Sequence, residues 1–152
     1  HTKIGMVEGP IGSFVSEERC KGFKNYLNNL DKIKLFHERG NFTYEGGLDS
    51  ANKLLKNNIT ALFCADDIMA FGCVDYIKKN TKLNIPEEIE VIGYDDISSA
   101  NWHSYNLTTI RQPVRQMSKL VTQIIDDNIK DPELEPINHL IQGKFIYRNT
   151  TR

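Results

Sequence analysis

Two short apolar runs in this sequence each lead into a pair of aspartates. The first run is 61–64 (ALFC), and the aspartates at 66–67 open a stretch with helical spacing of apolar residues over 67–79. The second run is 90–93 (EVIG), followed by the aspartates at 95–96. The carboxyl ends of parallel strands meet at one edge of a sheet, where ligands of open α/β sheets bind. The sequence therefore predicts a sheet edge that carries two carboxylate pairs.

The same alternation of strand and helix fills the rest of the first 97 residues. Expected strands lie at 3–8, 33–36, 61–64 and 90–93, and expected helices lie at 16–30, 44–57 and 67–79. This rhythm predicts an α/β fold with a twisted, mostly parallel sheet and helices on both of its faces. Ser16 is expected to cap the first helix. Asp67 and Asp96 are expected to cap helices and hold loops rather than to react.

The pattern changes after Asp96. An irregular polar stretch that contains Trp102 leads to a β-rich run at 107–111. Pro113 is expected at the first position of a helix with an apolar stripe that runs to about Asn128. Short strands are expected near 139–141 and 144–147.

Composition limits the possible functions. The chain has 152 residues, 39% of them hydrophobic, which suffices for one domain with its own core. Its net charge of −1 without a basic block argues against direct binding of nucleic acid or of a membrane. No apolar run approaches the roughly 20 residues that span a bilayer, and the first residues lack signal-peptide character, so we expect a cytoplasmic protein. The histidines lack metal-ligand spacing and no P-loop or nucleophile elbow occurs, so we expect no metal, no cofactor and no nucleophilic catalysis.

Four segments in register resemble the effector-binding core of LacI/GalR-family transcription regulators, which are relatives of the periplasmic sugar-binding proteins. They are KIGMVEGP at 3–10 with Arg19 after it, CADDIMAFG at 64–72, IPEEIEVIGYDDI at 85–97 and LTTIRQP at 107–113. The resemblance spans nearly the whole chain. It implies two α/β subdomains with a ligand in the cleft between them.

The resemblance also implies how the chain divides between the subdomains. Residues 1–111 correspond to the C-terminal subdomain, residues 112–143 to a helix and connector of the N-terminal subdomain, and residues 144–152 to a strand that returns to the C-terminal subdomain. Most of the N-terminal subdomain and the helix-turn-helix headpiece would then lie outside this chain. By this resemblance the chain holds one half of a ligand site.

The resemblance assigns ligand-binding roles to single residues. Arg19 matches an arginine whose planar fork grips sugar hydroxyls or a carboxylate, and Asp95 matches an acceptor of hydrogen bonds from ligand hydroxyls. Phe42 matches an aromatic residue that stacks on a sugar or a base. Asp66 stands where many sugar-responsive members carry Asn, which favours a donor-rich ligand because an ionised carboxylate only accepts hydrogen bonds. Less uniform cleft positions are matched by Ser13, Phe14 and Gln112.

The expected function is that of a ligand sensor. A small sugar-like effector would close the cleft of a dimeric repressor, and operator DNA would be bound only through the helix-turn-helix outside this chain. A phosphorylated partner protein in place of a small ligand stays open as an alternative. So do a sugar-binding protein of a transport system and an α/β enzyme that uses Asp66 or Asp95.

Overall fold

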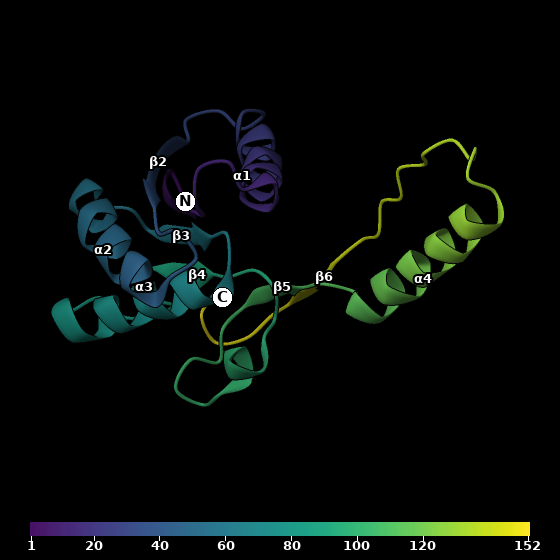
Figure 1. Cartoon of the computed structure of the whole chain (residues 1–152). Helices are drawn as coiled ribbons and strands as arrows, with labels where there is room; N and C mark the ends of the chain where they lie inside the picture. Colours follow the sequence, from purple (N-terminus) through teal and green to yellow (C-terminus); the bar gives the residue numbers. More distant parts are fainter.

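Four parallel strands form the central sheet of the structure, a computed structural model that describes residues 1–152 (Figure 1). Their order across the sheet is β2-β1-β3-β4, and all three pairings are parallel. The strands are β1 (Lys3–Glu8), β2 (Lys34–Arg39), β3 (Ala61–Cys64) and β4 (Glu90–Ile92). The direction of winding reverses between β1 and β3, so the chain leaves these two strands toward opposite faces of the sheet.

Helices cover both faces of this sheet (Figure 1). Helix α1 (Phe14–Leu27) lies on one face, and α2 (Tyr44–Leu54) and α3 (Asp67–Asn80) pack together on the other. Successive residues of β3 show why both faces are apolar. Phe63 stacks on Phe23 of α1 at 4.5 Å between ring centroids, whereas the sulfur of Cys64 lies 3.7 Å from that of Cys73 in α3. The predicted fold class is confirmed.

Short 3₁₀ turns complete this part of the chain. The first, η1 (Leu55–Asn57), follows α2, and the second, η2 (Ser98–Asn101), follows β4. Most of the core belongs to the strands and to α2 and α3, and loop residues such as Ile89 and Leu107 complete it. Its largest fully buried apolar side chains are those of Met6, Val7, Leu54, Leu62, Met69, Val74, Ile77, Ile89, Val91 and Leu107.

The last third of the chain forms a ribbon and an arm. Strands β5 (Thr109–Arg111) and β6 (Lys144–Ile146) pair antiparallel, and single bridges from Ile92 to Thr108 and from Asp95 to Arg111 continue the ribbon beside β4. Helix α4 (Val114–Lys130) and the extended return segment project away from the sheet, and no residue of α4 is buried (Figure 1). We call residues 112–143 the arm. None of the helices combines the length and apolar character needed to cross a membrane.

The first helix begins earlier than the sequence predicts. Ser13, not Ser16, caps α1, because its backbone is extended and its Oγ accepts the N–H of Ser16 at 3.3 Å. The hydroxyl of Ser16 is buried and accepts the N–H of Gly9 at 2.8 Å. Without this contact the buried N–H of Gly9 would lack a hydrogen-bond partner, which is costly in free energy. Ser16 supplies that partner from inside the helix, so it does not serve as the cap.

Two expectations in the last third of the chain are also wrong. No strand forms at 139–141, because this part of the arm has no neighbouring strand with which to pair. Helix α4 begins at Val114, so Pro113 is its cap rather than its first residue.

Candidate functional site

Loops from three strands meet at the carboxyl edge of the sheet, beside the reversal between β1 and β3. The chain leaves β1 at Gly9, β3 at Ala65 and β4 at Gly93. An edge of this kind is where open α/β sheets bind ligands. The structure therefore brings both predicted carboxylate pairs to the sheet edge that the sequence predicts.

Arg19 and Asp95 form the centre of this edge. Their side chains are joined by a hydrogen-bonded ion pair, with 2.7 Å from Nη2 to Oδ1 and 3.4 Å from Nη1 to Oδ2. Nη1 also donates to the carbonyl of Ala65 at 2.6 Å, and the guanidinium lies 4.1 Å from the centre of the Tyr94 ring. The arginine side chain is 11% exposed and that of the aspartate 26%. A guanidinium fixed on three sides presents its remaining donors in one direction, which suits recognition of hydroxyl or carboxylate groups.

The backbone of Asp95 and Asp96 has an unusual conformation. Their φ angles are 120° and 55°, values that non-glycine residues rarely adopt and that persist only when surrounding contacts enforce them. The N–H of Asp95 donates to the carbonyl of Ile110 at 2.9 Å. Arg148 donates to Asp96 at 2.6 Å and Arg111 donates to it as well. These contacts hold the site carboxylate in place.

The buried carboxylate of Asp96 is kept ionised by its two arginine partners. Burial by itself would raise the pKa of Asp96, but hydrogen bonds from Arg148 and Arg111 outweigh it and leave the pKa below the ordinary value. Asp96 therefore stays ionised and anchors the turn. This confirms that Asp96 holds a loop, although it caps no helix.

Asp66, rather than the predicted Asp67, is the cap of α3, whereas Asp67 holds a loop as expected. Asp66 caps α3, because its Oδ1 accepts the N–H of Met69 at 2.8 Å. Asp67 caps nothing; it accepts the N–H of Ile97 at 2.9 Å and the hydroxyl of Thr109 at 2.6 Å, so it ties the loop after β4 to β5. Burial raises the pKa of Asp66 to about 6, and the neighbouring carboxylates act in the same direction.

The other residues assigned to the site occupy different parts of the edge. Gln112 donates from Nε2 to Oδ1 of Asp95 at 2.5 Å and so joins the central pair. Phe42 is half-buried with a φ of 58°, and its ring covers Gly9, at which a Cβ atom would lie 2.4 Å from the ring. The hydroxyl of Ser13 caps α1, and Phe14 is 74% exposed.

Several residues of this edge carry no signal in the sequence. Arg148 lies 52 positions after its partner Asp96 and also donates to the carbonyl of Leu107. The carbonyl of Ala65 is a backbone group and leaves no trace in residue types. Tyr94 has a signal, since it stands directly before Asp95 in the triplet that points to the site.

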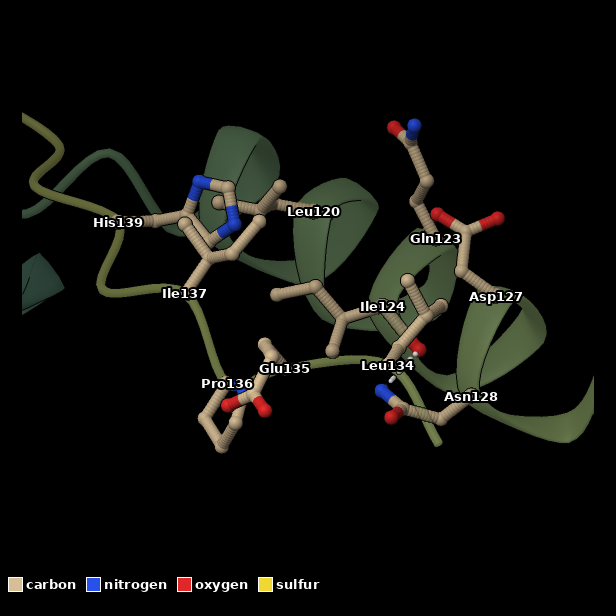
Figure 2. Close-up of a pocket in the computed structure, with 10 residues that line it drawn as sticks. All are labelled: Leu120, Gln123, Ile124, Asp127, Asn128, Leu134, Glu135, Pro136, Ile137 and His139. Atoms are coloured by element: carbon tan, nitrogen blue, oxygen red, sulfur yellow. Dashed lines mark hydrogen bonds between the residues drawn. The ribbon is translucent and has the colours of Figure 1, made fainter. Parts of the chain in front are cut away.

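A hollow lies within the arm, between α4 and the return segment (Figure 2). Its volume is about 360 Å³, and Leu120 and Ile124 of the helix line it opposite Leu134 and Ile137. No arginine or lysine lines it. No cluster of three or more His, Cys, Asp or Glu side chains in the structure could hold a metal ion. The edge around Arg19 and Asp95 is therefore the candidate site.

Comparisons with known proteins agree with this fold. Residues 1–151 match the family described as periplasmic binding protein-like domain. The chain belongs to this family. Within it, the similar proteins are LacI-family regulators, which confirms the resemblance predicted from the sequence.

Two curated relatives show the level of similarity. The chain is 38% identical over 139 residues to the HTH-type transcriptional repressor PurR of Aliivibrio salmonicida, covering 89% of this chain and 41% of the relative. It is 35% identical over 137 residues to the ribose operon repressor of Haemophilus influenzae, covering 87% of this chain and 41% of that repressor. The chain thus spans less than half the length of these relatives, which are transcriptional repressors.

Solved structures give the same result. The Lac repressor bound to ONPG superimposes with a TM-score of 0.87 at 27% identity, over 99% of this chain and 46% of the repressor chain. A LacI-family transcriptional regulator from Enterococcus faecium with bound ribose superimposes with a TM-score of 0.85 at 27% identity, over 99% of this chain and 57% of the regulator chain.

Proposed function

We propose that this chain is the ligand-sensing part of a LacI-type repressor and that it binds a small sugar-like effector at the edge around Arg19 and Asp95. The ion pair of these two side chains is the observation that carries the proposal. Sugar hydroxyls both donate and accept, and the pair offers a fixed donor fork beside a partly exposed acceptor. The ribose in the Enterococcus faecium structure supports this ligand class.

The remaining residues of the edge complete half of a binding surface. Phe42 would present a ring to the apolar face of a sugar. Asp66 would accept hydrogen bonds with the oxygen that does not cap α3. Ser13, Phe14 and Gln112 would line the rim of the site.

The arm supports the division of the chain between two subdomains. In this proposal residues 1–111 and 144–152 form one subdomain, and residues 112–143 contribute to a second subdomain that forms the other wall of the cleft. The exposed apolar side chains of α4 support the division, because an amphipathic helix normally buries its apolar stripe.

The proposed setting is a cytoplasmic homodimer that reaches operator DNA through a helix-turn-helix outside this chain. The similar curated repressors support this setting. An enzymatic role for Asp66 or Asp95 is not part of the proposal.

Calorimetric titration of the full-length protein with pentoses, hexoses and nucleobases tests the proposal. We expect one sugar class to bind and Arg19→Met and Asp95→Asn each to weaken binding at least tenfold, since a lost charged hydrogen bond costs about 1.5–3 kcal/mol. Lys21→Met on the same helix is the matched control, because Lys21 is exposed and its side chain hydrogen-bonds to Glu18 and not to the site. Sugar binding that survives both site substitutions, or no binding together with turnover of a substrate, would contradict the proposal.

A further inference from the structure

Gln112 joins the candidate site to the base of the arm. It is the first residue after β5, and α4 begins two positions later. Its amide Nε2 donates to Oδ1 of Asp95 at 2.5 Å. A carboxylate assigned to the ligand is thus bonded directly to the residue from which the arm departs.

Within the 152 residues described, the arm has few other attachments to the body. No residue of α4 is buried, and the chain enters and leaves the arm through β5 and β6 (Figure 1). The ribbon is itself anchored at the turn of Asp95 and Asp96. Ile110 accepts the N–H of Asp95, and Arg111 and Arg148 both donate to Asp96. Ligand site and arm therefore share one anchoring turn.

Oδ1 of Asp95 is already saturated with hydrogen bonds. It accepts from Nη2 of Arg19 at 2.7 Å and from Nε2 of Gln112 at 2.5 Å, and a carboxylate oxygen offers about two lone-pair positions. A ligand hydroxyl that donates to this oxygen must replace one of these donors. Arg19 is also held by the carbonyl of Ala65 and by the ring of Tyr94, whereas the side chain of Gln112 makes no second hydrogen bond. Gln112 is therefore the donor that leaves.

We propose that Gln112 is a positioning residue that latches the arm to Asp95 and is displaced when a ligand hydroxyl takes its place on this carboxylate. The inference rests on the proposed function, and it specifies how that site regulates the molecule. The hydrogen bond from this amide to Asp95 fixes the start of α4 against the anchoring turn. In the filled site the ligand takes over that hydrogen bond, the junction loosens, and the population shifts to another arm orientation.

Spin labels can report the orientation of the arm in the full-length protein. Lys56 lies on the body and Lys119 on α4, and both are exposed. The double variant Lys56→Cys and Lys119→Cys gives one label on each part, while the three native cysteines are buried and react slowly. We expect Gln112→Ala to broaden the distance distribution without ligand, and D-ribose to broaden that of the parent protein in the same way.

Gln112→Glu gives a second variant, because its carboxylate repels Asp95 and cannot donate. Gln116→Ala is the matched control, since Gln116 is an exposed glutamine of α4 without a side-chain hydrogen bond to the body.

The affinity for D-ribose separates the latch from an ordinary ligand contact. Removing the competing amide should make Gln112→Ala bind ribose about five to ten times more tightly. Weaker binding with an unchanged distance distribution would overturn the latch and leave the proposed function standing, since Gln112 would then touch the ligand itself. Where ribose binds neither protein, the proposed ligand class fails, and the ligand-free distances alone decide about the latch. If the ligand-free distance distribution is unchanged in both Gln112 variants, the latch is overturned. If it is broadened in both variants, the latch is supported.

Discussion

Asp66 is a helix cap with an unfavourable charge. Burial raises its pKa from 3.8 to about 6, so between these two pH values the folded protein holds a proton that the unfolded chain has already released. The contribution of this group to the free energy of unfolding therefore falls as the pH rises through about 6. We expect Asp66→Asn to raise the free energy of unfolding by about 1–3 kcal/mol at pH 8 and by much less at pH 4. Urea denaturation of both proteins at pH 4, 6 and 8 measures the difference.

A substitution at Asp66 that also removes the capping hydrogen bond should change the free energy of unfolding differently from Asp66→Asn. Asn caps helices as well as Asp does, so Asp66→Asn keeps the hydrogen bond to the N–H of Met69. Asp66→Ala removes it and should lower stability by about 1 kcal/mol relative to Asp66→Asn at every pH. An equal gain from Asp66→Asn at all three pH values would contradict the pKa argument.

At this scale the sequence predicts which residues gather at the edge but not which contacts they make. The position of Asp66 and Asp67 after an apolar run is enough to place both at the carboxyl end of a strand. Asp66 caps α3, whereas Asp67 accepts the hydroxyl of Thr109, which stands 42 residues later in the chain and carries no local signal of this contact. The pairing of Arg19 with Asp95 likewise joins residues 76 positions apart. The resemblance to a family assigns both residues to the ligand site but does not predict that they bond to each other.

At the scale of elements, α2 and α3 approach each other through glycines. A Cβ atom at Gly72 would lie 2.2 Å from the carbonyl oxygen of Tyr44, and one at Gly47 would lie 2.2 Å from that of Met69. Both obstacles are backbone atoms, so the helices themselves would have to move apart. We expect Gly72→Ala to lower the free energy of unfolding by about 3 kcal/mol in urea denaturation.

Gly22 in α1 provides the matched control for this contact. A Cβ atom there meets nothing within 4 Å, and the residue is exposed. Gly22→Ala should therefore stabilise the protein by about 0.5–1 kcal/mol, because alanine restricts the unfolded chain and favours the helix. A Gly72→Ala protein as stable as the Gly22→Ala protein would show that α2 and α3 are not in close contact.

The elements themselves follow from the sequence where local pattern and burial agree. Strands β1, β3 and β4 are short apolar runs, and each leads to a helix or loop with its own start signal. The expected strand at 139–141 fails because pairing depends on a neighbour, and the return segment of the arm passes no open strand edge. Local residue types give β-propensity but do not supply the partner strand.

At the scale of the molecule, the arm exposes an apolar stripe. One side of α4, with Leu120 and Ile124, faces the return segment (Figure 2). An adjoining stripe stays open, with Val121 at 53% exposure, Ile125 at 55% and Ile129 at 74%. Sequence periodicity predicts this stripe but not where α4 lies, because nothing within the chain covers this side of the helix. A contiguous exposed apolar face favours association between copies.

We expect the 152-residue chain to dimerise through α4, with the stripes of two copies packed against each other. Val121→Lys and Ile125→Lys should each shift the chain toward monomer in sedimentation velocity, with at least a tenfold weaker association, because each would place a charge at the centre of the contact. Gln116→Lys adds the same charge on another side of the helix and should leave the dimer unchanged. A monomeric parent chain whose circular dichroism still shows the full helix content would contradict this expectation, because α4 would then be folded without burying its stripe.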